Sequence, residues 1–325
     1  MDALTLIKQP IEADFEQFVT LFNQALTHTD KLLADTLTHI RQRGGKRMRP
    51  ILTLLMAKNF GEVSMTTQYA AIGLELLHTA SLVHDDVVDE STERRGQASL
   101  NASYNNKVAV LVGDYILSTA LLNVSFTHDN RIVKNLAQLG QTLAAGEILQ
   151  LSNVRNMDFS EEVYYQVIRQ KTASLFESCA VLGALSAHAT DEQAEQARLF
   201  GEQLGMMFQI RDDIFDYYDS AAIGKPTGND MAEGKLTLPV LYALNTTHYE
   251  SMITLARKVK LGTINNDEIA VLVEFTKQNG GIEYAEQRMR DFYGKALTFI
   301  ETNVTDGTIR QSLVAYLDYV MKRNY

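Results

Sequence analysis

The stretch IGLELLHTASLVHDDVV, residues 72–88, is apolar on almost every side when it is wound as a helix. ILTLLMAKNF (51–60) and VAVLVGDYILSTALLNV (108–124) share this pattern, which is typical of buried helices. Strand-like alternation is scarce, and four prolines in 325 residues leave long stretches without helix breakers. We therefore predict an all-α protein with ten or more helices.

Short segments rich in Gly, Asn, Asp or Pro separate the predicted helices, and their composition favours turns and loops. These segments are 41–50, 91–99, 127–130, 152–160, 219–235, 261–267 and 302–307. None resembles a domain linker, so we expect residues 1–325 to form a single domain.

Composition narrows the class of function. Asp and Glu number 40 against 30 Lys and Arg, giving a net charge of −10, whereas a nucleic-acid binder has a basic surface. The single cysteine, Cys179, lies among apolar and small residues and is expected to be a buried packing residue. No signal peptide, disulfide framework or membrane span of about 18 uncharged apolar residues is recognisable. We expect a cytoplasmic protein, and contact with a membrane surface stays open.

Two clusters of the form D-D-x-x-D lie within apolar helical sequence, at 82–89 and 209–216. Residues four apart share one face of a helix, so the outer aspartates of a cluster point the same way. The middle aspartate is turned by about 100° from its neighbour. The outer residues are Asp85, Asp89, Asp212 and Asp216, and the middle ones are Asp86 and Asp213. Carboxylates about 6 Å apart repel by roughly 3 kcal/mol at an effective dielectric near 20, so the clusters favour a bound cation.

Carboxylates without a set of His or Cys suit a hard cation such as Mg²⁺ or Mn²⁺. Mg²⁺ usually binds through one or two carboxylates and substrate phosphates, so two facing clusters would hold several ions around one polyphosphate. One cluster by itself would equally be a solvated acidic face. The adjacent His84 and Asp85 leave open a metal-dependent phosphohydrolase, which does not explain the second cluster. Glu75 and His78 form one Glu-x-x-His, whereas a di-iron bundle needs two.

Basic residues accompany both clusters, and Arg in particular offers planar, bidentate donors to phosphate. They are Lys46, Arg47 and Arg49 after a Gly-Gly pair, Arg94 and Arg95 after the first cluster, and Lys225 and Lys235 after the second. Each group by itself is also compatible with a charged turn. Together with the aspartates they predict a helical cavity for a diphosphate on an apolar tail.

The chain resembles the trans-isoprenyl diphosphate synthases (polyprenyl synthases) of the long-chain type. The motifs that carry the resemblance are GGKRMRP (44–50), LLHTASLVHDDVVDESTERRG (76–96), LVGDYIL (111–117), GEILQL (146–151), RQKTASLF (169–176), FQIRDDIFDYYD (208–219) and IGKPTGNDMAEGKLTLP (223–239). The resemblance implies mostly antiparallel helices around a deep central cavity, and a homodimer. It also implies condensation of isopentenyl diphosphate with an allylic diphosphate such as farnesyl diphosphate.

The resemblance also implies roles for the motif residues. Three Mg²⁺, with Mn²⁺ as a substitute, would be held by Asp85, Asp89 and Asp212, supported by Asp86, Asp213 and Asp216. Contacts to the allylic diphosphate would come from Arg94, Lys171, Gln209, Lys225 and Lys235, with Thr172 nearby. Isopentenyl diphosphate would be held by Lys46, Arg49, His78 and Arg95. The catalytic set would be Asp85, Asp89, Arg94, Lys171, Asp212 and Lys225.

Product length is expected to depend on Ser81 and Ala80, four and five residues before Asp85, because the family sets its cavity depth there. Both are small, so the analogy predicts a product of roughly C35 to C50, with octaprenyl favoured. A shorter-chain farnesyl or geranylgeranyl diphosphate synthase remains an alternative. A class I terpene cyclase would lack the cradle for isopentenyl diphosphate, and a non-catalytic subunit would typically lose the aspartate clusters. Transient membrane contact for product release also stays open.

Overall fold

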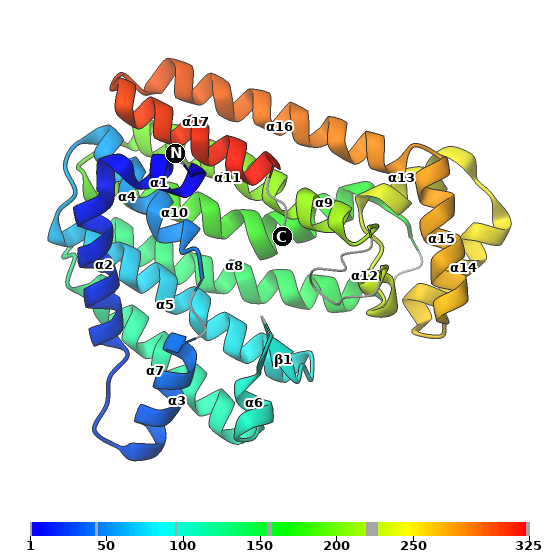
Figure 1. Ribbon diagram of the computed structural model, residues 1–325, viewed down its shortest axis with the longest axis horizontal. Helices are drawn as coiled ribbons and strands as arrows, with labels where there is room; N and C mark the ends of the chain where they lie inside the picture. Colours follow the sequence, from blue (N-terminus) through cyan, green and yellow to red (C-terminus); the bar gives the residue numbers. More distant parts are fainter. Residues whose placement is uncertain (1, 43–44, 95, 155–157, 219–226, 323–325) are drawn as a thin grey trace. The chain divides into compact units, whose positions relative to one another are not determined.

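The computed structural model describes residues 2–42, 45–94, 96–154, 158–218 and 227–322. Its residues are overwhelmingly helical, with more than ten helices in the described ranges, so the prediction of an all-α protein is confirmed (Figure 1). The chain divides into two compact units, Met1–Gly140 with Leu175–Leu199 and Val304–Leu313, and Gln141–Ser174 with Phe200–Asn303 and Val314–Tyr325. The single-domain assignment stays a prediction.

The first unit contains the N-terminal helices and one small hairpin. Its elements are α1 (Ala3–Lys8), η1 (Gln9–Ile11), α2 (Glu12–Ala25), α3 (Lys31–Gln42), α4 (Met48–Phe60), α5 (Met65–Val88), β1 (Glu93–Arg94), β2 (Gln97–Ala98), α6 (Leu100–Ser103), α7 (Asn106–Ser125) and α10 (Ser174–Ser186). Parts of α8 (Asn130–Val154), α11 (Asp191–Phe215) and α17 (Gly307–Lys322) also belong to it.

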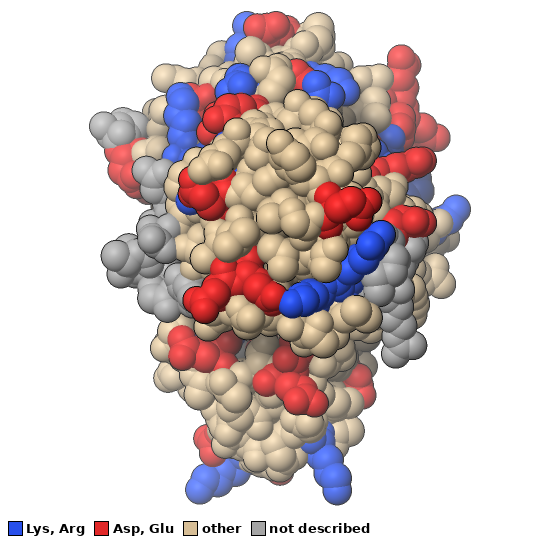
Figure 2. All heavy atoms as spheres, turned by 90° about the vertical axis from the view of Figure 1, so that its right-hand side faces the viewer, with Lys and Arg blue, Asp and Glu red and all other residues tan. Residues whose placement is uncertain are grey.

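The second unit contains the rest of α8, α11 and α17 and the helices between them. Its other elements are α9 (Glu161–Ile168), the π-helical turn η2 (Arg169–Ala173), α12 (Asn229–Ala232), α13 (Leu238–Thr247), α14 (Glu250–Leu261), α15 (Asn266–Gln278) and α16 (Gly281–Asn303). On the face that Figure 2 shows, Lys and Arg lie singly or in small groups among Asp and Glu.

Helix α5 carries the first aspartate cluster and packs along α7 (Figure 1). A capping box fixes its start, because Ser64 Oγ accepts the N–H of Thr67 and Thr67 Oγ1 accepts the N–H of Ser64. Glycine allows the close approach to α7, since a Cβ at Gly113 would lie 2.3 Å from His84 Nε2. The C-terminal turn of α5 is thus held firmly against its neighbour.

Helix α7 passes the length and hydropathy test for a membrane span over Asn106–Ser125, with a mean hydropathy of 1.6 and 39% of the window buried. The criterion applied to the sequence was about 18 uncharged apolar residues, and this helix does not meet that criterion because it contains Lys107 and Asp114. One such helix is weak support for a membrane protein, since the core helix of a soluble protein passes the same test.

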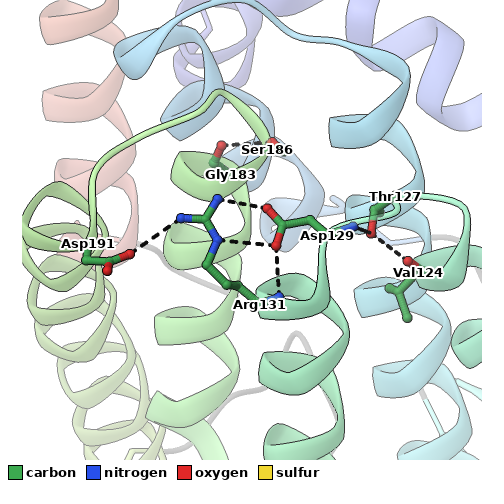
Figure 3. A network of polar contacts seen from close by, with 7 residues as sticks. All are labelled: Val124, Thr127, Asp129, Arg131, Gly183, Ser186 and Asp191. Carbon is green, nitrogen blue, oxygen red and sulfur yellow. Dashed lines mark hydrogen bonds and ion pairs between the residues drawn. The ribbon is translucent and has the colours of Figure 1, made fainter.

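The turn between α7 and α8 is held by a polar network (Figure 3). Both carboxylate oxygens of Asp129 accept hydrogen bonds from Arg131, at 3.2 Å from Nε and 2.8 Å from Nη2. Arg131 also reaches Asp191, at the start of α11, across 3.4 Å. The hydroxyl of Thr127 donates to the carbonyl of Val124 at 2.6 Å. These contacts set the loop that joins two long helices of the first unit.

Candidate active site

The first aspartate cluster lies at the C-terminal end of α5. Asp85 and Asp86 belong to its last turn, and Asp89 is the capping residue, whose N–H donates to the Asp85 carbonyl at 2.8 Å. Asp86 is fully buried, Asp85 is partly buried and Asp89 is exposed. Helix C-termini carry partial negative charge, so three carboxylates there are unfavourable without a positive partner. The position of the cluster strengthens the case for a cation.

Arg94 supplies part of that positive charge. Its Nε donates to Oδ1 of Asp86 across 2.5 Å, and the Asp86 side chain is only 1% exposed. The β1–β2 hairpin, in which Arg94 pairs with Gln97, presents the guanidinium to the helix end. Asn101 closes the loop by donating to the carbonyls of Asp86 and Ser91. Arg94 was predicted to contact diphosphate, and the structure adds a structural role for it.

The residues predicted to hold isopentenyl diphosphate also belong to the first unit. Lys46 is exposed just before α4, and the Arg49 guanidinium lies 5.4 Å from the ring centroid of Phe176. His78 is half-buried on α5, which packs against α4. Arg95 lies outside the described residues, as does Lys225 of the predicted allylic site.

The second cluster lies at the C-terminal end of α11, with Asp216 just beyond the last helical residue. Asp213 is buried and accepts two hydrogen bonds, from the Tyr164 hydroxyl at 2.6 Å and from Gln209 Nε2 at 2.8 Å. Thr172 donates to Oε1 of the same Gln209 amide at 2.7 Å. Burial raises the pKa of Asp213 well above its ordinary value. Tyr164, which the sequence analysis missed, therefore positions the middle aspartate.

Asp216 caps the short helix α12. Its two carboxylate oxygens accept the N–H groups of Asn229 and Asp230, at 3.0 and 3.1 Å. Its carbonyl accepts the N–H of Gly228 at 2.8 Å. Burial raises the pKa of Asp230 to about 7, and repulsion from the Asp216 carboxylate adds to the shift. Asp230, a second residue that the sequence analysis missed, thus joins the carboxylates of this cluster.

A pocket of about 150 Å³ opens beside the second cluster. It brings together four residues predicted to contact or lie near the allylic diphosphate, Lys171, Thr172, Gln209 and Lys235. Its lining also includes Gln150, Tyr164, Asp213, Asp230 and Lys260. With Asp213, five of the predicted site residues are therefore neighbours within one unit, although they are up to 64 positions apart in the sequence (235 minus 171).

The two described lysines of the predicted allylic site, Lys171 and Lys235, each have a carboxylate partner. Lys171 Nζ lies 2.6 Å from Glu147 and 3.4 Å from the side-chain oxygen of Gln150. Lys235 Nζ lies 2.6 Å from Glu233. The oxygens of a bound diphosphate would replace these carboxylates as the partners of the two lysines. The lysines are therefore already positioned to contact anionic groups. The sequence analysis did not identify Glu147, although it lies in the GEILQL motif.

The six aspartates of the two clusters were predicted to bind or support Mg²⁺. Within the described ranges, no group of three or more His, Cys, Asp or Glu side chains is arranged to hold a metal ion. Asp86, Asp213 and Asp216, the three predicted to play a supporting role, accept hydrogen bonds from Arg94, Tyr164 and the Asn229 N–H respectively. The direct ligands Asp85, Asp89 and Asp212 stay a prediction.

The phosphohydrolase alternative loses its support from His84, and Cys179 is a packing residue. His84 Nε2 lies 3.3 Å from both the Asp114 carboxylate and the Val110 carbonyl, so its ring is engaged with α7. Cys179 is buried, as predicted, and burial raises its pKa to about 12, which keeps the thiol protonated. Of the predicted length-determining pair, Ala80 is 1% exposed, while Ser81 is half-buried and donates to the His78 carbonyl.

Comparison with known proteins identifies the family. The polyprenyl synthetase family model matches residues 30–275. An all-trans-nonaprenyl-diphosphate synthase (geranyl-diphosphate specific) of Rhodobacter capsulatus is 37% identical over 95% of this chain and 94% of its own.

Two solved structures share the fold. A geranylgeranyl pyrophosphate synthase of Bacteroides thetaiotaomicron is 52% identical, with a TM-score of 0.88 over 99% of this chain and 100% of the other. A polyprenyl synthase of Caulobacter crescentus, complexed with calcium and isoprenyl diphosphate, is 28% identical, with a TM-score of 0.91 over 98% of both chains. From its aspartate clusters, its lysine-lined pocket and these matches, the chain belongs to the polyprenyl synthetase family.

Proposed function

We propose that the protein condenses isopentenyl diphosphate head-to-tail onto an allylic diphosphate and makes a long-chain, all-trans polyprenyl diphosphate. The observation that carries this proposal is the pocket beside α11, where Lys171, Lys235, Thr172 and Gln209 meet Asp213. The nonaprenyl synthase relative supports a long product, and we expect roughly C35 to C50, with octaprenyl favoured.

The chain's own residues would act on both substrates. In the proposed site Lys171 and Lys235 donate to the allylic diphosphate and stabilise the charge that grows as its C–O bond ionises. Lys46, Arg49 and His78 hold isopentenyl diphosphate so that its double bond is in line with the allylic carbon. The apolar helices keep water from the allylic cation. The departing diphosphate takes the proton, so the reaction needs no dedicated protein base.

The proposal includes divalent cations at the aspartate clusters. Asp85, Asp89 and Asp212 would hold Mg²⁺, three ions by family resemblance with Mn²⁺ as a substitute, which supplies electrophilic stabilisation of the leaving diphosphate. The three supporting aspartates would orient these ligands. The calcium and isoprenyl diphosphate in the Caulobacter structure support such a pairing of a hard cation with a prenyl diphosphate.

We further propose a cytoplasmic homodimer that contacts membranes transiently when it releases product. The support is an exposed apolar stripe on α7, where Leu111 and Leu122 are 67% and 56% exposed. Residues eleven positions apart lie only about 20° apart around a helix, so Leu111 and Leu122 lie in one row along α7. Val110 and Leu121, which have the same spacing and are also exposed, form a second row. A stripe of this kind favours a partner surface, because large apolar patches are rare on monomers.

A shorter-chain synthase is the second candidate. It is favoured by the 52% identity to the geranylgeranyl pyrophosphate synthase structure, which exceeds the 37% identity to the nonaprenyl relative. The small residues Ala80 and Ser81 oppose this candidate, since neither side chain would block a growing tail. Product analysis separates the two candidates.

The deciding experiment incubates the protein with farnesyl diphosphate, labelled isopentenyl diphosphate and Mg²⁺, and identifies the products by mass spectrometry. We expect label in products longer than geranylgeranyl diphosphate. Diphosphate release without label would indicate a cyclase, and silence until another chain is added would indicate a subunit. Asp85→Ala should reduce elongation by at least about 100-fold, whereas Asp35→Ala, an exposed aspartate of α3, should not.

A further inference from the structure

Lys260 is a third lysine of the pocket beside α11. It lies on α14, outside every motif that carries the family resemblance, yet it lines the same pocket as Lys171 and Lys235. The residue is only 6% exposed, and lysine is almost never buried to this degree unless it is paired. Its burial therefore needs an explanation that its helix does not supply.

The hydrogen bonding of Lys260 is incomplete. Its Nζ donates to the carbonyl of Asn153, near the end of α8, at 2.9 Å. This is the one hydrogen bond that the described residues give it, whereas an ammonium carries three N–H donors. Burial lowers the pKa of Lys260, and the charge of Asp158 acts in the opposite direction. Donors remain for a further acceptor at a place where the protein leaves room for one.

Lys260 also differs from its neighbours in charge balance. Lys171 and Lys235 each have a carboxylate within 2.6 Å, Glu147 and Glu233. Among the described residues Lys260 has no carboxylate within ion-pair distance and meets a neutral carbonyl instead. Among the described lysines of the pocket, Lys260 is the one whose charge an entering anion meets without displacing a protein carboxylate.

We propose that Lys260 donates to the diphosphate group in this pocket, whether that group belongs to the allylic substrate or is the released pyrophosphate. The inference rests on the proposed assignment of the pocket to the allylic diphosphate. A structural role alone, closing the C-terminal end of α8 through Asn153, would require the hydrogen bond but not the charge.

Lys260→Gln separates the two roles, because an amide still donates to the Asn153 carbonyl but carries no charge. We expect isothermal titration with inorganic pyrophosphate, at fixed Mg²⁺, to show about tenfold weaker binding than in the wild type. The same variant should raise KM for the allylic diphosphate by a similar factor. Lys258→Gln is the matched control, since Lys258 lies on the same helix and pairs with Glu268 outside the pocket. It should bind pyrophosphate as the wild type does.

Two further variants complete the test. Lys171→Gln and Lys235→Gln should also weaken pyrophosphate binding. If they do and a folded Lys260→Gln binds like the wild type, the role of Lys260 is refuted and the pocket assignment stands. If none of the three weakens binding, the pocket assignment itself fails. If Lys260→Gln does not fold, Lys260→Arg replaces it, and this variant should bind pyrophosphate as the wild type does because it keeps the charge. The unfolding of the wild type is then measured with and without pyrophosphate. A wild-type protein that pyrophosphate does not stabilise would refute the proposal.

Discussion

Arg94 and Asp86 form a close ion pair, 2.5 Å from Nε to Oδ1, between a two-residue strand and the end of α5. The Asp86 side chain is 1% exposed and that of Arg94 is 29% exposed. Asp86 is therefore a buried carboxylate that Arg94, eight positions later, helps to compensate. This pair joins the first aspartate cluster to the hairpin that follows it.

Arg94→Met should lower the free energy of unfolding by about 3 kcal/mol, because it removes a charged hydrogen-bond partner from a buried carboxylate. Urea denaturation measures the effect. The double variant Asp86→Asn/Arg94→Met should recover a large part of the loss, since the buried charge is then absent. A double variant no more stable than Arg94→Met would contradict the pairing as the source of the effect.

Tyr164→Phe should lower the free energy of unfolding by about 2 kcal/mol, because Asp213 is buried and loses one of its two donors. Tyr293→Phe is the control. Its hydroxyl also donates to an aspartate, Asp318 at 2.7 Å, but that pair is more exposed and its loss should amount to less than about 1 kcal/mol. Equal losses in urea denaturation would remove the case for Tyr164 as a positioning residue.

Acid stability should depend in part on Asp129. The hydrogen bond from Arg131 holds the pKa of Asp129 below its usual range in the folded protein. A lowered pKa stabilises the fold above the unfolded value of about 3.9, and the contribution disappears as the pH falls through the folded value. Asp129→Asn should therefore flatten the loss of stability below about pH 4. The effect should stay under about 1 kcal/mol, since Arg131 is largely exposed.

Denaturation curves between pH 2 and pH 7 measure this contribution. Asp191→Asn serves as the control, because Asp191 contacts the same guanidinium but its side chain is 92% exposed. The control should reproduce the wild-type dependence on pH. A wild-type dependence in Asp129→Asn would show that the network of Figure 3 does not shift this group.

Ala80→Tyr should shorten the product to about C20 or less, because an aromatic ring at this depth would close the space for the tail. Chromatography of the extracted products measures the length. Ala80 is 1% exposed, so the ring also costs about 1 to 3 kcal/mol through overpacking. Ser81→Tyr, at a half-buried position, tests the same idea with less strain. Ala102→Tyr, at an exposed position, is the control and should leave the product length unchanged. An unchanged product in both Ala80→Tyr and Ser81→Tyr, with both variants folded, would refute this account of the cavity.

The sequence predicts the helices well because their signals are local. The apolar stretch 72–88 forms the greater part of α5. The helix begins earlier, at Met65, because Ser64 caps it there. The hairpin around Arg94 could not be predicted, since two residues per strand show no alternation. Helix geometry gives the rotation of Asp86 away from Asp85, but not the burial that rotation produces.

The residues that the sequence analysis missed share one physical reason. Each of them contacts a residue far away in the sequence. Tyr164 contacts Asp213, 49 positions away (213 minus 164), and Glu147 contacts Lys171, 24 positions away (171 minus 147). Lys260 contacts Asn153, 107 positions away (260 minus 153). Such contacts depend on how helices pack, and no local pattern encodes them. The motif residues were found because they carry charge within apolar surroundings, which is visible in the sequence.

The π-helical turn η2 places Lys171 and Thr172 in the pocket. The number of residues between Tyr164 and Ala173 should therefore be fixed during evolution. Deleting one residue between Tyr164 and Lys171 would rotate Lys171 by about 100° and move it by about 1.5 Å along the helix. A Cβ at Gly205 would lie 2.4 Å from the Cα of Ala173, so the turn has little space in which to adjust. Insertions or deletions within 164–173 should therefore be eliminated among the descendants of this protein.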